Sequence, residues 1–263
     1  MGVKTQITVA KLQQLFPSYG FTKLTPTTSG VIDTTYIAYT QTTSYILKHF
    51  ERDIEQQVAK DALLLKELQL QGLNVPTHLK ASQGWHLYTR LKGVSPSRVR
   101  AYHLQSLAQF LSTMHKERRV NSFNAKRELP IAEELHYVKK HYFSYYKRML
   151  FLKSFRDRDE ALIHGDIFKD NTLFEGKKIG VIDFIDSFRG SFAFDVGVAL
   201  VGFDVKLTDE YSLSLFLNAY NQKRVKKITK SEVREMMRVA SCYYGLKRIY
   251  RDNTTHTAKE LLV

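Results

Sequence analysis

The stretch LIHGDIFKDNTLFEGKKIGVIDF, residues 162–184, decides how this chain of 263 residues is interpreted. Two segments within it, Thr172–Phe174 and Gly180–Ile182, have the length and composition of short strands. The polar segment Glu175–Lys178 between them is typical of a hairpin turn. The sequence therefore predicts a polar loop, then a hairpin, then an acidic residue at the end of the second strand.

The polar residues around this hairpin suit phosphoryl transfer. In kinases an Asp orients the acceptor hydroxyl and takes its proton, while an Asn and a second Asp hold magnesium ions. Asp166 and Asn171 have the spacing of the kinase motif H-R-D-x-x-x-x-N, and Asp183 stands where a later D-F-G supplies the metal-binding Asp. We therefore predict Asp166 as the catalytic base and Asn171 and Asp183 as magnesium ligands. Gly165 replaces the Arg of that motif, and any one of these residues alone would favour an ordinary surface turn.

The segments HGDIFKDN (164–171) and VIDF (181–184) resemble the aminoglycoside phosphotransferase and choline kinase superfamily, and the step at Phe168 resembles its homoserine kinase branch. The resemblance implies an α+β, two-lobed, protein-kinase-like fold with ATP between the lobes. A small N-terminal lobe with an antiparallel sheet, residues 1–91, would bind ATP. A larger and mainly helical C-terminal lobe, residues 92–263, would carry the catalytic residues and bind the acceptor.

Apolar periodicity predicts the elements of both lobes. The N-terminal lobe is expected to contain a helix at 8–16, strands at 21–24, 34–40 and 43–49, a helix at 53–72, and strands at 77–81 and 85–91. The C-terminal lobe is expected to contain helices at 98–115, 131–155, 211–220 and 231–251, with another near Asp195. His115, at the end of the first of these helices, is expected to be a packed or capping residue.

The loop TPTTSGVIDT, residues 25–34, is expected to cover the ATP phosphates with backbone N–H groups and hydroxyls, with Ser29 and Gly30 as binding residues. Homoserine kinases similarly carry G-x-x-N-T-x-Y here, so Asp33 stands where Asn is usual and its role is open. Lys48 ends an apolar strand, as the Lys of V-A-I-K does in kinases, and is expected to bridge the α- and β-phosphates.

In kinases a helix after that strand supplies an acid that pairs with the Lys. Alignment with the pattern E-A-x-x-L-x-x-L-x-x-x-G-x-x-V-P of relatives puts Asp61 in this position, and Glu67 and Glu55 are the alternatives. The resemblance further implies a hinge around the last strand of this lobe. Its ATP-binding residues there are Tyr88, Thr89 and Leu91.

Two residues are expected to support the catalytic loop rather than to react. His164 would hold the loop by hydrogen bonds. Asp195 fits the family's D-x-G step, and it is expected to cap a helix and brace the catalytic loop.

The acceptor is expected to be a small alcohol, with L-homoserine favoured and O-phosphohomoserine as the product, a step in threonine biosynthesis. Homoserine is a zwitterion, so it needs a cation for its carboxylate and an anion for its ammonium group. Position alone suggests Arg189, Lys247 and Arg248 as the cation and Asp186 as the anion.

Other acceptors stay open. Choline and ethanolamine call for an aromatic cage, which Tyr243 and Tyr244 would offer. Methylthioribose is a further alternative. Aminoglycosides are polycations that call for an acidic pocket, and they suit a chain with a net charge of +14 less well.

Composition bounds the remaining classes. One cysteine, Cys242, excludes an intramolecular disulfide, and neither a signal peptide nor an apolar run long enough to span a bilayer is apparent. We therefore expect a cytoplasmic enzyme, monomer or dimer, with ATP and Mg²⁺ as cofactors and no membrane partner. The basic charge also suits nucleic acid, but apart from 116–119 and 223–230 Lys and Arg are dispersed, without interleaved aromatics, so nucleic-acid binding is not expected. The rival class is a non-catalytic nucleotide- or nucleic-acid-binding protein.

Overall fold

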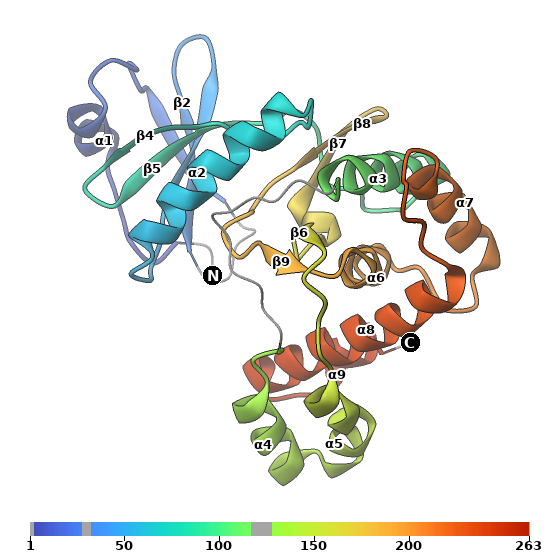
Figure 1. Ribbon diagram of the computed structural model, residues 1–263. Helices are drawn as coiled ribbons and strands as arrows, with labels where there is room; N and C mark the ends of the chain where they lie inside the picture. The colour runs from blue at the N-terminus through green and yellow to red at the C-terminus, as the bar shows by residue number, and fades with distance from the viewer. Residues whose placement is uncertain (1–2, 28–32, 117–127, 263) are drawn as a thin grey trace. The chain divides into compact units, whose positions relative to one another are not determined.

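The computed structural model describes residues 3–27, 33–116 and 128–262 (Figure 1). Its internal contacts divide the chain into two compact units. Unit 1 comprises Met1–Gly93 with Gly180–Ile185, and unit 2 comprises Val94–Ile179 with Asp186–Val263. The short segment that carries Asp183 therefore belongs to the same unit as the N-terminal sheet, whereas Asp166 belongs to unit 2. The division into domains 1–91 and 92–263 stays a prediction.

Unit 1 contains a five-stranded antiparallel sheet with the strand order β1-β2-β3-β5-β4. Its strands are β1 (Lys23–Pro26), β2 (Thr34–Tyr39), β3 (Ser44–His49), β4 (His78–Ser82) and β5 (Trp85–Thr89). Residues of β2 alternate between buried and half-buried positions, because successive side chains of a strand point to opposite faces. Pairing of β3 with both β2 and β5 puts Lys48 opposite Thr35 on one side and His86 on the other.

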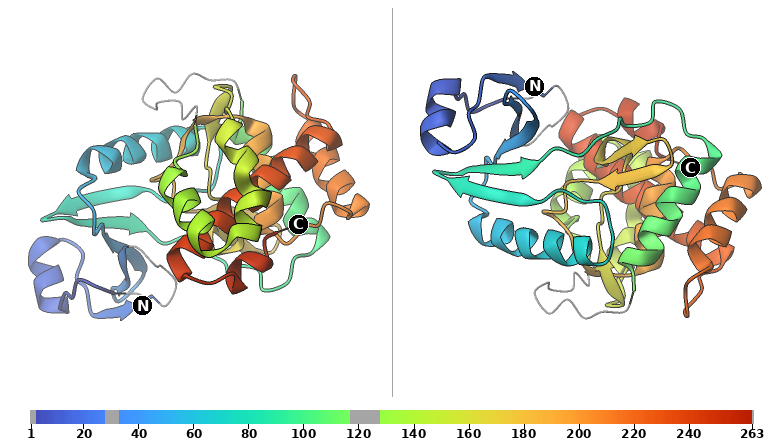
Figure 2. Two further views of the ribbon diagram at one scale, coloured as in Figure 1. Left: turned by 90° about the horizontal axis from the view of Figure 1, so that it is seen from below. Right: turned by 90° about the horizontal axis from the view of Figure 1, so that it is seen from above.

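Two helices belong to the same unit. Helix α1 (Val9–Leu15), expected at 8–16, begins after Thr8, whose side chain accepts a hydrogen bond from the Lys11 N–H. Helix α2 (Glu55–Leu70) lies beside the sheet in Figures 1 and 2. Its buried residues are Val58, Asp61, Leu64, Leu65 and Leu68. Their spacing makes one face of α2 apolar except for Asp61.

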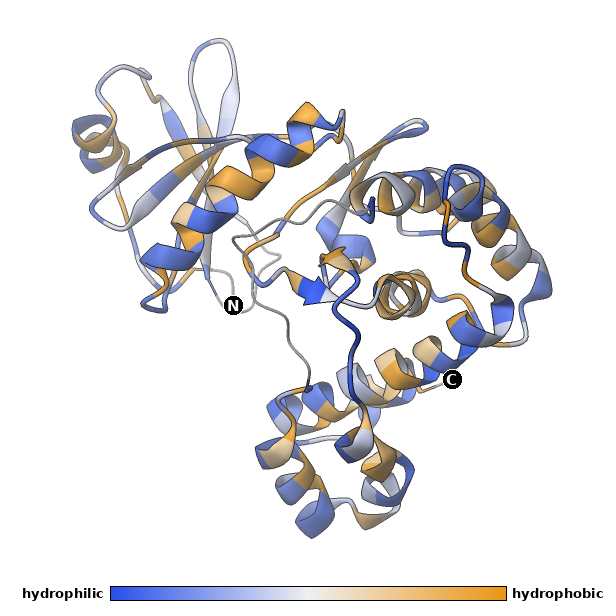
Figure 3. Cartoon of the chain, in the orientation of Figure 1, coloured by the Kyte–Doolittle hydropathy of each residue, from blue (hydrophilic) through white to orange (hydrophobic). Residues whose placement is uncertain are grey.

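Unit 2 is built around α6 (Phe192–Gly202), in which every residue is buried. Figure 3 shows this helix mostly in the hydrophobic colour, as expected for a helix covered on all sides. The other long helices of the unit are α3 (Ala101–Met114), α7 (Glu210–Asn221) and α8 (Lys230–Asp252), followed by the short α9 (His256–Lys259). Gly197 lets α6 approach α8 closely, since a Cβ atom there would lie 2.6 Å from the Met236 carbonyl carbon.

The segment that decided the sequence interpretation forms short elements. Strand β6 (Ala161–Ile163) leads into the catalytic loop and pairs with β9 (Phe188–Gly190). The loop ends in a single 3₁₀ turn, η2 (Lys169–Asn171). The predicted hairpin follows as β7 (Thr172–Glu175) and β8 (Lys178–Val181). The described residues thus confirm a small antiparallel sheet followed by a mainly helical portion.

The single helix expected over residues 131–155 was wrong. The structure has α4 (Ala132–His141), α5 (Phe143–Met149) and a 3₁₀ segment, η1 (Leu150–Ser154). The break falls at Tyr142, whose backbone (φ −141°, ψ 58°) is not helical. The Tyr142 hydroxyl donates a hydrogen bond of 2.6 Å to the Asn253 carbonyl. This contact with the end of α8 accompanies a break that helical spacing of aromatics does not reveal.

No described helix combines the length and apolar character that crossing a membrane requires.

Candidate active site

Asp166 and Asn171 form a contact within unit 2. The Asn171 side-chain Nδ2 donates to the Asp166 carbonyl at 2.8 Å and to its carboxylate Oδ2 at 3.1 Å. The preceding residues His164 and Gly165 are buried, whereas the Asp166 side chain is partly open to solvent. The five-residue spacing read from the sequence therefore closes a compact loop, which fixes the carboxylate and leaves it accessible.

His164 supports this loop through its side chain. Its Nδ1 accepts a hydrogen bond of 3.2 Å from the Asp166 N–H. The ring nitrogen that accepts this bond carries no proton. His164 thus holds the backbone of the residue predicted to be the base.

Gly165 occupies the position of Arg in the protein-kinase motif for a local steric reason. Its φ is +79°, in the region that favours glycine. A Cβ atom added there would lie 2.8 Å from Cε1 of Phe188, in the strand that pairs with β6. A larger residue at this position would have to displace the Phe188 ring.

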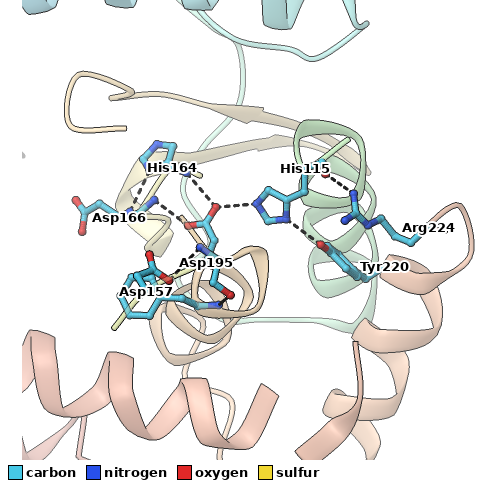
Figure 4. A network of polar contacts seen from close by, with 10 residues as sticks. His115, Asp157, His164, Asp166, Asp195, Tyr220 and Arg224 are labelled. Carbon is cyan, nitrogen blue, oxygen red and sulfur yellow. Dashed lines mark hydrogen bonds and ion pairs between the residues drawn. The ribbon is translucent and has the colours of Figure 1, made fainter. Parts of the chain in front are cut away.

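Asp195 connects the catalytic loop to the core of unit 2 (Figure 4). Its Oδ2 accepts from the His164 N–H at 3.0 Å, and its Oδ1 accepts from the Gly165 N–H at 2.8 Å. Burial alone raises the pKa of Asp195, but the hydrogen bond from His115 and those from the loop N–H groups outweigh it and hold the pKa below its ordinary value. The expectation that Asp195 caps its helix was wrong. Ser191 is the N-cap of α6, and its hydroxyl accepts from the Phe194 N–H.

His115 is the residue that sequence reasoning underestimated. It is the C-cap residue of α3 and fully buried, as expected, but its ring also bridges two helices. Its Nε2 lies 2.9 Å from Asp195 Oδ2 and its Nδ1 lies 2.9 Å from the Tyr220 hydroxyl. Burial lowers the pKa of His115 and raises that of Tyr220, so a neutral ring donates from Nε2 to Asp195 and accepts from Tyr220.

Arg224 completes this buried network. Its guanidinium donates to the His115 carbonyl and stacks over the rings of Phe192 and Tyr220, at 4.9 and 5.5 Å from their centroids. The network joins α3, α6 and α7 beneath the catalytic loop (Figure 4). Its members are far apart in the sequence, so no local motif indicated their pairing.

Within unit 1, Lys48 Nζ and Asp183 Oδ1 form an ion pair of 2.7 Å. Asp183 has a φ of 68°, which is uncommon for a residue other than glycine. Such backbone conformations persist where the surroundings enforce them, and they concentrate at functional sites. The structure therefore brings together the predicted phosphate-binding Lys and one predicted magnesium ligand.

The three candidate acids for Lys48 occupy different surroundings. Asp61 is buried in unit 1, and its charge, together with that of Asp183 and with burial, raises the pKa of Tyr88. Glu55 is exposed and lies 3.8 Å from the His86 ring, and Glu67 is exposed. Asp61 is the candidate that faces the sheet.

The other residues assigned to ATP are only partly described. Ser29 and Gly30 lie outside the described residues. Tyr88 is buried in β5, the Thr89 hydroxyl accepts from the Thr77 N–H at 2.8 Å, and Leu91 is half-buried. These backbone and packing positions fit a hinge, but binding of adenine there stays a prediction.

Asp33, whose role was open, is engaged within unit 1. Its Oδ1 accepts from the Glu51 N–H at 3.2 Å, and its Oδ2 lies 3.7 Å from the Arg52 guanidinium. These contacts compensate the charge of a carboxylate next to the loop assigned to the phosphates.

The acceptor candidates differ in availability. The Arg189 guanidinium is paired with Asp159 at 2.7 Å. Arg248 donates to the Thr257 carbonyl at 3.2 Å and lies 5.8 Å from the Phe168 ring centroid. Asp186 is exposed in unit 2. Their assignment to an acceptor stays a prediction.

The predicted magnesium ligands are chemically suitable. Because the Asn171 amide nitrogen is used by Asp166, its carbonyl oxygen is the atom left for a metal. The described residues contain no group of three His, Cys, Asp or Glu that could hold a metal ion.

Comparison with known proteins decides the family. The model of the phosphotransferase enzyme family (APH) matches residues 23–224, more than half of the chain. The chain belongs to this family. The residues quoted for the superfamily resemblance, 164–171 and 181–184, lie inside the matched range.

Two curated homoserine kinases share modest identity with the chain. A homoserine kinase of Bradyrhizobium diazoefficiens is 26% identical over 270 residues, covering 88% of this chain and 80% of its own length. A homoserine kinase of Methylobacillus flagellatus is 25% identical over 292 residues, covering 95% and 87%.

Solved phosphotransferases share the fold. The macrolide 2'-phosphotransferase MphH of Brachybacterium faecium has a TM-score of 0.70 at 16% identity, covering 97% of both chains. The choline kinase LicA of Streptococcus pneumoniae has a TM-score of 0.66 at 15% identity, and the match covers 96% of both chains. The amicoumacin kinase hAmiN, solved with AMP-PNP and Ca²⁺, has a TM-score of 0.68 at 15% identity. The match covers 96% of this chain and 92% of that kinase. These likenesses confirm the predicted α+β kinase-like fold.

Proposed function

We propose that this phosphotransferase uses ATP and Mg²⁺ to phosphorylate the hydroxyl of a small molecule, with L-homoserine as the acceptor and O-phosphohomoserine as the product. The observation that carries the chemistry is the accessible Asp166 carboxylate, held by Asn171 in the kinase spacing. Support for homoserine comes from the curated relatives named homoserine kinase, which cover most of this chain at low identity. Support for ATP comes from a fold neighbour solved with AMP-PNP.

In the proposed reaction the acceptor oxygen forms a bond to the γ-phosphorus of ATP while the bond to the β–γ bridging oxygen breaks. Asp166 orients the acceptor hydroxyl and receives its proton. Asn171 and Asp183 are the proposed magnesium ligands, and magnesium, when bound, neutralises charge on the phosphates. Lys48 balances the α- and β-phosphates, assisted by Asp61. His164 and Asp195 hold the loop in place.

The decisive experiment compares two Asp variants of the same loop. Asp166→Asn is expected to abolish phosphorylation and to retain ATP binding, because the amide keeps the shape but cannot take a proton. Asp170→Asn, at an exposed neighbouring position, is the matched control and should retain activity. The measurements are product formation by phosphorus NMR and ATP binding by calorimetry. Loss of ATP binding in Asp166→Asn, or equal turnover in both variants, would contradict the role given to Asp166.

An acceptor panel tests the substrate. L-homoserine, choline, ethanolamine, methylthioribose and kanamycin are each incubated with ATP, with and without Mg²⁺. Homoserine is expected to give the highest kcat/KM, in keeping with a place in threonine biosynthesis. Preference for another alcohol would retain the kinase and reject homoserine. A protein that binds nucleotide or RNA without Mg²⁺-dependent phosphorylation of any acceptor would belong to the non-catalytic class. We also propose a cytoplasmic location and a monomeric or dimeric state, which fractionation and light scattering test.

A further inference from the structure

Two adjacent tyrosines of α8 lie beside the catalytic loop in unit 2. The Tyr244 hydroxyl donates to the carbonyl of Gly165, the residue before Asp166. The ring of Tyr243 meets that of Tyr244 edge-on, with 5.0 Å between centroids. The position of Tyr243 relative to the predicted base is therefore set by a direct contact between α8 and the loop.

One helical turn after Tyr243, α8 presents Lys247. Its Nζ lies 5.6 Å from the Tyr243 ring centroid. The ammonium group is paired with Glu134 of α4 and donates to the Pro130 carbonyl at 2.7 Å. An ammonium group has three donors, and these described contacts use two of them. The Lys247 side chain retains 33% of its accessible surface, so an anion can reach it.

Carboxylates also act on the same tyrosine. Burial raises the pKa of Tyr243 to about 12, and the charges of Glu134, Asp166 and Asp186 add to this effect. The hydroxyl of Tyr243 is therefore neutral at physiological pH and lies within electrostatic range of both Asp166 and the exposed Asp186. Lys247 therefore lies against one half-buried aromatic residue, whose neighbour Tyr244 contacts the catalytic loop.

We propose that Lys247 binds the carboxylate of the acceptor beside Tyr243, on the helix whose Tyr244 contacts the catalytic loop. The acceptor class is then an alcohol that carries a carboxylate, as homoserine does. Glu134 is a positioning residue that fixes the Lys247 ammonium. This inference rests on the proposed function, because it assigns the acceptor half of the same reaction.

Of the other two candidate cations, Arg189 keeps 18% of its side-chain surface accessible, against 33% for Lys247. Arg189 is held by Asp159 at 2.7 Å, and the Arg248 guanidinium donates to the Thr257 carbonyl and packs against Phe168. A cation beside Tyr243 also disfavours a quaternary ammonium ligand there, since like charges repel at close range. The same ring that suggested a choline cage is therefore better suited to an amino acid.

The test removes one partner of the proposed ion pair at a time. The enzyme loses the Lys247 ammonium group, and the acceptor loses its carboxylate. Lys247→Met is assayed with L-homoserine and with 3-aminopropan-1-ol, which lacks only the carboxylate. The KM for homoserine is expected to rise about 10- to 100-fold, the effect of losing a hydrogen bond to a charged group. The KM of Lys247→Met for 3-aminopropan-1-ol is expected to differ from that of the wild type by less than about 3-fold. If aminopropanol turns over too slowly for a KM, its inhibition constant against homoserine is compared instead.

Further variants keep the result interpretable. Lys247→Arg retains a cation and should recover most of the homoserine affinity, whereas Glu134→Gln should raise the KM for homoserine without changing that for aminopropanol. Lys230→Met is the matched control, because Lys230, about 25 Å along α8 from Lys247, also pairs with a Glu, namely Glu210 of α7. The KM for ATP is expected to stay constant throughout.

The outcomes separate the inference from the function on which it rests. Wild-type enzyme that phosphorylates no amino-acid alcohol rejects the proposed substrate. Wild-type enzyme that phosphorylates homoserine, with Lys247→Met unchanged or impaired equally for both acceptors, rejects Lys247 as the carboxylate site and leaves the kinase intact.

Discussion

The Asp195 carboxylate and the His115 imidazole, 80 positions apart in the chain, lie 2.9 Å apart in the fully buried interior of unit 2. The same carboxylate accepts the N–H groups of the two residues that precede Asp166. The catalytic loop is thereby fastened to α6 and to the end of α3 by one side chain. This contact links the stability of the helical core to the position of the catalytic base.

Asp195→Asn is expected to lower the free energy of unfolding by about 2–3 kcal/mol. The amide has one acceptor oxygen in place of two, so its NH₂ group must face a buried donor of the loop or of His115. We further expect a large fall in kcat and only a small change in the KM for ATP, because the displaced loop carries Asp166. Urea unfolding and steady-state kinetics measure the two effects. An Asp195→Asn protein with wild-type stability and kcat would contradict the anchoring role.

Substitution of glycine tests the steric account of the catalytic loop. Gly165→Ala should cost about 1 kcal/mol of unfolding free energy more than Gly176→Ala. Both positions have positive φ, which costs about 1–2 kcal/mol for alanine, but a Cβ atom at Gly176 meets nothing within 4 Å. The added cost at Gly165 comes from overpacking against Phe188. Combining Gly165→Ala with Phe188→Leu should recover this difference, and failure to recover it would exclude the Phe188 contact as its cause.

Asp157 is expected to make stability increase as the pH falls. Burial raises its pKa from 3.8 to about 6, although its carboxylate accepts from the Ser191 and Arg158 N–H groups. The stability contributed by protonation of Asp157 is fully present below pH 3.8, the ordinary pKa of the group, and is lost as the pH rises through about 6. Between pH 7.5 and pH 5, wild-type protein should gain about 1 kcal/mol more than Asp157→Asn.

The comparison with the variant is essential because histidines act in the opposite direction. Burial lowers the pKa values of His78 and His86 in unit 1, so their contribution to stability is present above 6.5 and is lost as the pH falls through their folded-state values. Unfolding curves at several pH values give the difference between wild type and Asp157→Asn, in which the histidine effect cancels. Parallel curves for the two proteins would show that Asp157 is ionised normally.

Lys48→Met is expected to separate activity from stability. The Lys48–Asp183 ion pair is partly exposed, with 17% and 40% of the side chains accessible, so its loss should change the unfolding free energy by less than about 1 kcal/mol. Turnover should fall more than about 100-fold, because a charge that stabilises the transferring phosphates is removed. Thermal unfolding and ATP consumption are measured on the same sample. A large loss of stability with activity retained would assign the pair a purely structural role.

The sequence predicted much of the fold, because its elements are encoded locally. Thr8 caps α1, the hairpin at 172–181 has apolar strands around a polar turn, and α8 keeps one apolar face over its full length. The long helix expected over 131–155 failed because helical spacing of aromatics does not disclose a tertiary contact. The break at Tyr142 accompanies its hydrogen bond to Asn253, more than 100 residues away.

By itself, the sequence determined which residues the catalytic loop contains. Asp166, Asn171 and Gly165 are close in the chain, so covalent spacing and local hydrogen bonds bring them together. Only the tertiary structure decided what holds that loop and what surrounds it. Asp195 meets His115, Lys48 meets Asp183, and Lys247 meets Glu134 across 80, 135 and 113 positions. Such pairs depend on the packing of whole helices and strands, which no local pattern of residues specifies.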